Sequence, residues 1–379
     1  MKICIVNHKF KKGDGQGRVN YEIFKAAANR GYEITLLASE IAPEIKEYPG
    51  LKCIYIPVKS IPTELLRNLV FTQQSATWLH KNRNIFDVIK VNGAITNAQA
   101  DMNAVHFVHS SWLQSPAHIS RTRHDLYGAY QWLYTAANAI WEQQSFQQAR
   151  LIVAVSEKVK QELVTLGIPA TKIRTITNGV DLQEFTPGNS SRTQLGLPED
   201  INLALFAGDI RTSRKNLDTI FHALLQVPNL HLAVVGNTEG SPFPGLATSL
   251  GLGGRVHFLG YRRDIAAIMR AADVFVFPSR YEACTLVLLE AMASGLPVIT
   301  ANTTGGAELV TPGSGIVLSD CNDIQSLSSA MSFLVNRPSL MKSMGKAARI
   351  VAEANSWKNM ARTYLNLFEE LNHQWKTQF

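Results

Sequence analysis

Short apolar runs alternate with segments of helical period along this chain, and the pattern starts twice. In the first half, the apolar runs lack the polar–apolar alternation of half-exposed strands, which indicates parallel strands buried on both faces. We expect these strands at 3–6, 34–38, 53–57, 88–91, 105–108, 151–155 and 173–176. Helices are expected between them at 18–29, 65–81, 127–148 and 157–166.

The pattern restarts after turn-forming residues at 186–191. Six strands are expected at 203–207, 230–235, 256–258, 274–277, 297–301 and 315–317, with helices at 217–225, 265–271, 286–293 and 324–334. Strand–helix alternation predicts parallel sheets, and therefore an α/β protein with two Rossmann-like, doubly wound domains, 1–185 and 186–355. An amphipathic helix over 356–379 is expected to pack on the first domain. Such sheets bind ligands at the carboxyl ends of their strands, so we expect a cleft between the domains.

Composition excludes several classes of protein. No apolar run among the 379 residues reaches the ~18–20 residues that span a bilayer, which excludes a transmembrane protein. The first segment turns polar at Asn7, too early for a signal peptide, so a cytoplasmic location is expected. The four cysteines form no C-x-x-C pair, which argues against a disulfide framework and a structural zinc site.

The net charge of +7 is unevenly distributed. Residues 1–189 hold 21 Lys and Arg against 15 Asp and Glu, whereas residues 190–379 hold 16 against 15. This asymmetry favours an anionic partner for the first domain, either a phosphate-bearing substrate or an anionic membrane surface, with solvated lysines as the alternative. No nucleic-acid-binding module is recognised, so nucleic acid is not an expected partner.

Glycines follow the first predicted strand at Gly13, Gly15 and Gly17. Glycine lets backbone amides approach a phosphate, and a following helix N-terminus adds a favourable dipole. The dinucleotide fingerprint G-x-G-x-x-G would need glycine where this chain has Arg18, which disfavours a nicotinamide site. The segment predicts either a phosphate-binding loop or a flexible turn.

Two histidines accompany the strand expected at 105–108. Residues three apart on a strand point to opposite faces, so His106 and His109 are not expected to share a metal ion. His109 falls at the predicted carboxyl end of the strand and is therefore a candidate site residue. A core or supporting role is favoured for His106.

Charged residues follow two strands of the second half. Arg211, Arg214 and Lys215 precede a predicted helix, where cations and backbone amides can hold a diphosphate; a solvated basic loop is the alternative. Glu282 lies on a predicted loop and Glu290 within the next helix, which is otherwise apolar. A glutamate there is costly to bury unless it is paired or bound, and a carboxylate can accept both hydroxyls of a ribose.

The segment from Glu282 to Glu290, with 291–299 after it, resembles the E-x7-E signature of the retaining glycosyltransferases of family 4. Further segments resemble motifs of that family in the same order, so the resemblance spans the chain and implies a GT-B fold. These segments are Asn178-Gly179-Val180-Asp181 with Phe185, residues 207–215, residues 304–310 and the tail from Trp357.

The resemblance implies roles for individual residues. Glu290 would hold the nucleotide ribose, Glu282 a hydroxyl of the transferred sugar and Lys215 the diphosphate, while His109 would contact the donor sugar. The implied catalytic residues are His109, Glu282, Arg211 and Lys215. The implied donor-binding residues are Gly15, Gly17, Asn178, Gly208, Arg211, Lys215, Glu282, Cys284, Thr285, Leu286 and Glu290.

Two departures from the family pattern stand in the donor segments. The family often has Arg where this chain has Asp209, so we assign the missing role to Arg211. Where the family often has glycine, this chain has Thr285, a larger side chain that alters the fit around the donor sugar.

The resemblance implies retaining transfer of a hexose-type sugar from a UDP- or GDP-sugar to a saccharide, lipid-linked or other hydroxyl acceptor, in glycan, lipopolysaccharide or glycolipid biosynthesis. No D-x-D motif is evident, and Arg211 and Lys215 can replace a metal, so we expect neither a cofactor nor a metal ion. Two alternatives stay open: a sugar-nucleotide epimerase of similar fold and a catalytically silent scaffold that binds nucleotide sugars.

The acceptor is expected on the first domain, with Arg18, Trp112, Arg121 and Arg123 as candidate contacts. Residues 115–134 mix basic and aromatic side chains, which suits either sugar rings or a lipid headgroup layer. The helix at 61–79 reads as a core helix or, less favoured, as membrane-facing. Peripheral attachment to the inner face of a membrane therefore stays open as a hypothesis.

Overall fold

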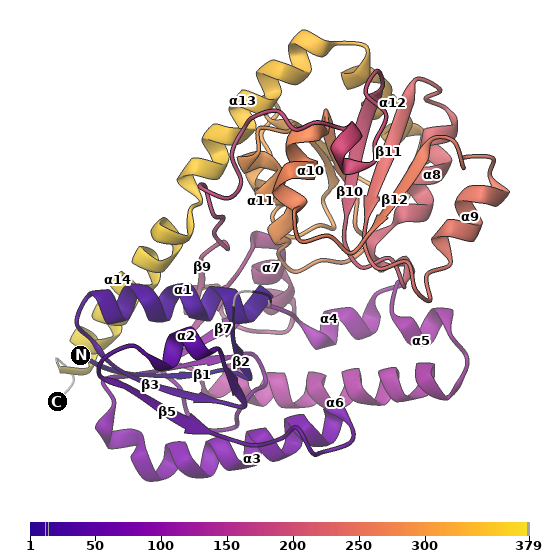
Figure 1. The fold of residues 1–379 in the computed structure, drawn as a ribbon. Helices are drawn as coiled ribbons and strands as arrows, with labels where there is room; N and C mark the ends of the chain where they lie inside the picture. Colours follow the sequence, from indigo (N-terminus) through magenta and orange to yellow (C-terminus); the bar gives the residue numbers. More distant parts are fainter. Residues whose placement is uncertain (12, 14, 377–379) are drawn as a thin grey trace. The chain divides into compact units, whose positions relative to one another are not determined.

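The computed structural model describes residues 1–11, 13 and 15–376, which form two compact units (Figure 1). The first unit comprises Met1–Gly179 together with the tail from Trp357, and the second unit comprises Val180–Ser356. Each unit contains one large parallel sheet, as the two starts of the strand–helix pattern predict.

The sheet of the first unit has the strand order β5-β3-β1-β6-β7-β8-β9. Its order reverses next to β1, which places a topological switch point at the carboxyl ends of β1 and β6. These strands are β1 (Lys2–Val6), β3 (Glu33–Ala38), β5 (Leu51–Tyr55), β6 (Val88–Asn92), β7 (Met102–Val105), β8 (Leu151–Ala154) and β9 (Ile173–Thr175). A separate short parallel pair is formed by β2 (Lys9–Phe10) and β4 (Glu40–Ile41), which follow β1 and β3 in the sequence.

Helices cover both faces of this sheet, with α1 on one face and α3 on the other (Figure 1). The tail helix α14 packs against α1 and β6, where its apolar face meets the core. The helices are α1 (Gly15–Asn29), α2 (Pro43–Lys46), α3 (Glu64–Asn82), α4 (His109–Gln114), α5 (Ile119–Thr122), α6 (Leu126–Gln148), α7 (Glu157–Thr165) and α14 (Trp357–Lys376), with 3-10 turns at Arg83–Ile85 and Ala170–Lys172.

The sheet of the second unit has the order β12-β11-β10-β13-β14-β15, again with all strands parallel. Its strands are β10 (Asn202–Ala207), β11 (Leu230–Val235), β12 (Val256–Gly260), β13 (Val274–Phe277), β14 (Val298–Ala301) and β15 (Gly315–Leu318). Its helices are α8 (Leu217–Leu225), α9 (Phe243–Ser249), α10 (Ile265–Ala271), α11 (Leu286–Ala293), α12 (Ile324–Val335) and α13 (Pro338–Ala354), with 3-10 turns at Thr193–Leu195, Ser213–Lys215 and Ala307–Leu309.

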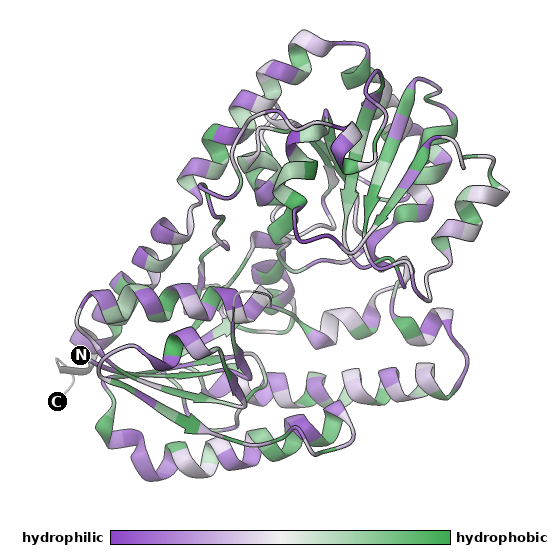
Figure 2. Cartoon of the chain, viewed as in Figure 1, coloured by the Kyte–Doolittle hydropathy of each residue, from purple (hydrophilic) through white to green (hydrophobic). Residues whose placement is uncertain are grey.

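The sheets carry the apolar cores. In Figure 2 the strands of both units are mostly hydrophobic, whereas the helices show hydrophilic outer faces. Stacked phenylalanines, Phe206, Phe275 and Phe277, are fully buried at the centre of the second sheet. Burial on both faces is why these strands show no alternation in the sequence. Among the described helices, none is long and apolar enough to cross a membrane.

Two predictions about this architecture need correction. The strand expected at 105–108 lies at Met102–Val105 instead, because the polar Asn103 within it is buried and bonded to Gly93 and Ser145. Residues 106–108 form a loop, so the argument from opposite strand faces does not apply to the two histidines. The units divide after Gly179 rather than after 185, since Phe185 belongs to the core of the second unit.

Candidate functional site

In the second unit, a basic turn follows β10 at Ser213–Lys215 and is fixed to the loop after β13. The carbonyl oxygen of Arg214 accepts hydrogen bonds from the Arg280 amide at 3.0 Å and the Ser279 hydroxyl at 3.1 Å. Arg280 is itself held by a bidentate ion pair with Asp218. The backbone of this turn is therefore positioned independently of any ligand.

The side chains of this turn reach the first glutamate of the E-x7-E segment. Arg214 donates to Glu282 Oε1 and to the Tyr281 carbonyl oxygen, both at 3.1 Å, and the Lys215 ammonium contacts the other oxygen of Glu282. Lys215 is buried and also lies over the ring of Phe277, 5.0 Å from its centroid. Burial lowers the pKa of Lys215, so its charge depends on neighbouring carboxylates such as Asp209, whose charge raises that pKa.

The backbone around Glu282 is clamped to the loop that follows β14. The Gly305 amide donates to the Glu282 carbonyl oxygen at 2.9 Å, and the Thr285 amide donates to the Gly305 carbonyl oxygen at 3.1 Å. A side chain on Gly305 would lie 1.7 Å from the Ala283 carbonyl oxygen, so only glycine allows this close approach.

Helix α11 begins directly after this loop. Its N-cap residue, Thr285, is buried and makes no side-chain capping bond to the helix. Cys284 and Leu286 flank it and are partly buried. Glu290 lies further along the helix, partly buried between apolar neighbours. The first turn of α11 thus offers a positive dipole end near two carboxylates and two cations, which suits a ligand that carries both phosphate and hydroxyl groups.

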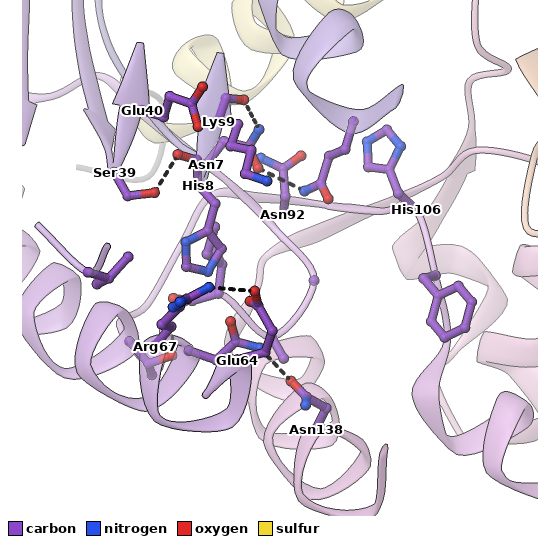
Figure 3. A pocket seen from close by; sticks show the side chains of 18 of the residues that line it. Asn7, His8, Lys9, Ser39, Glu40, Glu64, Arg67, Asn92, His106 and Asn138 are labelled. Atoms are coloured by element: carbon purple, nitrogen blue, oxygen red, sulfur yellow. Dashed lines mark hydrogen bonds and ion pairs between the residues drawn. The ribbon is translucent and has the colours of Figure 1, made fainter. Parts of the chain in front are cut away.

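In the first unit, a cavity of about 410 Å³ lies over the carboxyl ends of the central strands (Figure 3). Its polar lining is rich in side-chain amides and hydroxyls, and it also contains two glutamates, three cations and three histidines. The lining residues are Asn7, His8, Lys9, Gln16, Ser39, Glu40, Val58, Lys59, Glu64, Arg67, Asn68, Thr72, Asn92, Gly93, Ala94, Ile95, His106, Phe107, His109, Tyr134 and Asn138.

Two of these three histidines, His106 and His109, are kept neutral by burial. Burial lowers the pKa of His109 to about 4, and burial together with the charge of Lys90 lowers that of His106 to about 3. The His109 Nδ1 and His106 Nε2 atoms are buried and have no hydrogen-bond partner among the described residues. Each can therefore offer a hydrogen bond to a ligand without carrying charge.

His109 is positioned by Glu142, a buried residue of α6. The Glu142 carboxylate accepts the backbone amides of His109 and Ser110 at 2.8 and 2.7 Å, which caps the N-terminus of α4. Burial raises the pKa of Glu142 to about 7, against the lowering effect of these two bonds.

A second buried group supports the cavity floor. Lys90 is fully buried and donates to the side-chain oxygens of Asn20 and Asn92 at 2.8 and 2.9 Å. Its ammonium also lies 5.5 Å from the centroid of the Tyr364 ring. Burial lowers the pKa of Lys90 to about 7. This cluster joins α1, β6 and the tail helix α14.

Two family models match the chain in succession. Residues 13–184 match the model described as Glycosyltransferase Family 4, and residues 189–351 match the one described as Glycosyl transferases group 1. The chain belongs to the family-4 glycosyltransferases. This confirms the resemblance drawn from the E-x7-E segment and identifies the protein as a glycosyltransferase.

Known relatives agree with this family and with the GT-B fold. D-inositol 3-phosphate glycosyltransferase from Xylanimonas cellulosilytica is 26% identical over 94% of this chain and 92% of its own length. Sucrose-phosphate synthase from Thermosynechococcus elongatus has a TM-score of 0.80 at 22% identity, covering 98% of both chains. Anabaena HepE, solved with UDP and glucose, has a TM-score of 0.72 at 20% identity, covering 98% of this chain and 100% of its own. The predicted fold is confirmed.

The structure of this glycosyltransferase brings Lys215 and Glu282 together, but it does not place Arg211 with them. Arg211 is exposed and forms a bidentate pair with Asp209, with both N–O distances at 2.9 Å. Arg214, rather than Arg211, lies beside Glu282 and Lys215. Gly208 directly follows β10, and a Cβ added there would lie 3.5 Å from the Phe277 ring, which is an ordinary van der Waals contact.

The remaining predicted residues lie in the first unit. Gly15 begins α1 and Gly17 is buried within it, while Asn178 is buried just before the unit boundary. Arg18 pairs with Glu22 at 2.7 Å and lies over the ring of Trp357.

The four candidate acceptor contacts, Arg18, Trp112, Arg121 and Arg123, are not among the described residues that line the cavity. Trp112 is only 7% exposed and packs against His118. Arg121 is exposed, and Arg123 pairs with Asp125 and lies over Tyr127.

The sequence analysis did not identify the buried polar residues that support the site. Glu142 sits in a helix without other charges, and Asn20 and Asn92 sit in an apolar core. A lone charged or amide residue inside an apolar pattern is the signal that could have identified them, because such a group is costly to bury without partners. Among the described residues, no cluster of three or more potential metal ligands is found.

Proposed function

We propose that this glycosyltransferase transfers a hexose-type sugar from a UDP- or GDP-sugar to a hydroxyl acceptor, with retention of configuration and without a metal ion. The observation that carries the proposal is the cluster of Arg214, Lys215 and Glu282 beside the N-terminus of α11. Cations and a helix dipole at one place can stabilise the negative charge that develops on a departing diphosphate.

The roles proposed for the donor follow from this cluster. Lys215 and the backbone amides at the start of α11 hold the diphosphate, Glu290 accepts the ribose hydroxyls and Glu282 accepts a hydroxyl of the sugar. Arg214 and Lys215 supply two cations for the diphosphate, which is why we propose metal-independent transfer. Binding of UDP by Anabaena HepE supports a uridine donor for a protein of this fold.

A thermal-shift panel tests the donor site. UDP, GDP, ADP and their common sugar conjugates are added with and without EDTA, because a ligand that binds only the folded state raises the melting temperature. A selective shift that survives EDTA supports the donor site and metal independence. If no nucleotide shifted the melting temperature, the result would contradict the proposed donor site. Nucleoside diphosphate release without a glycosylated product would favour the epimerase.

Retention is tested on the product. The anomeric configuration of the transferred sugar, read from proton coupling constants immediately after transfer, should match that of the donor. An inverted product would contradict the retaining mechanism while leaving the transferase assignment intact.

We place the acceptor in the cavity of the first unit and propose that it is a polyol with an anionic substituent. Amides and hydroxyls around the cavity suit sugar or cyclitol hydroxyls. Lys9 and Lys59 lie at the cavity. A hydrogen bond from Lys11 lowers the pKa of Glu40, and the charges of Lys11, Lys59 and Lys9 lower it further. Glu40 neutralises one of these three cations, so an excess of positive charge remains for a phosphate. The phosphorylated acceptor in the name of the Xylanimonas relative supports this choice.

The acceptor proposal is tested by comparing phosphorylated and neutral polyols as acceptors. The Lys9→Gln/Lys59→Gln variant should lose activity towards the phosphorylated acceptors and keep its donor binding. Lys52→Gln, which removes an exposed lysine of the same unit away from the cavity, is the matched control. Equal use of neutral and phosphorylated acceptors by the wild type would overturn this choice.

We also propose peripheral attachment to an anionic membrane through α6. Residues 126–141 of this helix contain no charged residue, and Leu126, Trp132, Leu133 and Ile140 are each more than half exposed. Arg121 and Arg123 precede this surface and suit anionic headgroups. Sedimentation with anionic vesicles at low salt tests it: the Trp132→Gln/Leu133→Gln variant should bind less than the wild type, and failure of the wild type to bind would remove the proposal.

A further inference from the structure

The cations of the proposed donor site are already neutralised by carboxylates of the same unit. Arg211 is paired with Asp209, while Arg214 and Lys215 share the two oxygens of Glu282. The side chains of Arg214, Lys215 and Glu282 are between 11% and 25% exposed, so water screens them only in part. An incoming diphosphate must therefore compete with Glu282 for the same two cations.

The backbone on each side of this ion cluster is fixed. Glu282 pairs with Thr304 in an isolated parallel bridge, and its carbonyl oxygen accepts the Gly305 amide. The turn that carries Arg214 and Lys215 is held through the Arg214 carbonyl oxygen, as described above. Any exchange of partners must therefore occur by rotation of the side chains alone, without movement of a loop.

We infer that Glu282 acts as an internal competitor for the diphosphate, and that a bound donor transfers Arg214 and Lys215 from Glu282 to its phosphates. This inference rests on the proposed function. Once released, the Glu282 carboxylate is available to a hydroxyl of the transferred sugar. A complete sugar nucleotide thus gives Glu282 a new hydrogen-bond partner, the sugar hydroxyl, whereas a nucleoside diphosphate without its sugar does not.

This exchange sets the order of affinities at the site. The donor displaces Glu282 and then engages it, so the loss of the ion pairs is offset by the new hydrogen bond. The nucleoside diphosphate product displaces Glu282 without engaging it, so the carboxylate returns to Arg214 and Lys215 and expels the product. Glu282 therefore favours binding of the donor over binding of the product in two ways: it competes with the product for the cations, and it bonds to the sugar of the donor.

Binding of UDP to Glu282→Gln tests the inference, because UDP has no sugar for this residue to contact. Glutamine keeps the shape of the side chain and removes its charge. We expect the Kd for UDP, measured by isothermal titration calorimetry, to fall roughly three- to tenfold, as competition from a partly exposed ion pair is lost. A residue that only contacts the sugar would leave the Kd for UDP unchanged.

Glu199→Gln is the matched control, since it removes an exposed carboxylate before β10, at the opposite end of the same sheet. Its Kd for UDP should equal that of the wild type. Glu282→Ala is the second variant, and either Glu282 variant decides the matter if it retains the wild-type melting temperature and circular dichroism spectrum.

The outcomes separate this inference from the proposed function. Wild-type protein that binds none of UDP, GDP and ADP contradicts the proposed donor site. Wild-type protein that binds UDP, with Glu282→Gln binding it equally or more weakly, overturns the internal competitor and leaves the donor site standing. Tighter UDP binding by Glu282→Gln, together with slower sugar transfer, supports both.

Discussion

The candidate sites of the two units bury ionisable side chains in different ways. In the second unit, Arg214 and Lys215 lie against Glu282, so each buried charge has an opposite charge beside it. In the first unit, Lys90 bonds to amide oxygens and Glu142 to backbone amides, and neither forms an ion pair within the described part of the chain.

This difference determines which groups stay charged. A buried group without an opposite charge shifts its pKa towards the neutral form, as Lys90, His109 and Glu142 do. Burial also lowers the pKa of Lys215, but the charge of Asp209 opposes this shift and the Glu282 carboxylate lies beside the ammonium. The second unit is therefore suited to a charged leaving group, and the floor of the first unit's cavity is suited to recognition by hydrogen bonds.

Removal of Lys215 should have the largest effect. Lys215→Ala takes away the buried ammonium proposed to stabilise the departing diphosphate, and we expect kcat to fall roughly 100-fold or more, as for other groups that stabilise developing charge. Steady-state kinetics at saturating donor measure this. Lys342→Ala, an exposed lysine of the same unit, is the control. A kcat within about threefold of wild type would remove Lys215 from the mechanism.

The second prediction separates the two arginines of the same segment. Arg214→Ala should lower kcat/KM for the donor about 10- to 100-fold, because a partly buried guanidinium that contacts Glu282 is lost. Arg211→Ala should lower it by less than about threefold, since an exposed pair with Asp209 contributes little. A larger loss for Arg211 than for Arg214 would restore the assignment made from the sequence.

The sequence predicted the sheets well, because strands buried on both faces leave continuous apolar runs. Val274–Phe277 and helix Leu286–Ala293 match the expected ranges in full. The Met102–Val105 strand was displaced in the prediction because Asn103 breaks its apolar run and finds its partners only in the folded chain. Propensity and pattern cannot show partners that are distant in the sequence.

The candidate site was predictable where a motif fixes the spacing. Glu282 and Lys215 belong to ordered segments, and the fold brings them together from 67 residues apart. The choice between Arg211 and Arg214 was not predictable, because it depends on whether Asp209, two residues from Arg211, captures its guanidinium. The cavity of the first unit was also missed, since its lining comes from many separate elements, each contributing one or two polar residues.

A third prediction concerns Glu142, a buried carboxyl group that forms no ion pair within the described part of the chain. The pKa of Glu142 is about 7 in the folded chain and 4.5 is its ordinary value, so its contribution to stability is complete below pH 4.5 and is lost as the pH rises through 7. A shift of this size corresponds to on the order of 3 kcal/mol. Glu142→Gln should therefore gain stability relative to wild type between pH 5 and pH 8.

Chemical denaturation of both proteins at several pH values measures this difference. Glutamine keeps an oxygen that can accept the amides of His109 and Ser110, so the cap on α4 is retained in part. Because the other titrating groups are common to both proteins, they cancel in the comparison. Parallel stability curves for wild type and Glu142→Gln would show that this carboxyl group is ionised in the folded chain like a paired one.

The smallest expected effect lies at the hydrogen-bonding wall of the cavity. Asn68 on α3 donates to the Tyr134 hydroxyl at 3.2 Å, and its side chain lines the cavity beside Asn138. Asn68→Ala should raise KM for the acceptor about 3- to 10-fold, the effect of one neutral hydrogen bond, and leave KM for the donor unchanged. Asn82→Ala, at the end of the same helix and outside the cavity, controls for helix stability. If Asn68→Ala instead raised KM for the donor and for the acceptor equally, one side chain of the first unit would serve both substrates. The division between charge in the second unit and hydrogen bonding in the first would then not hold.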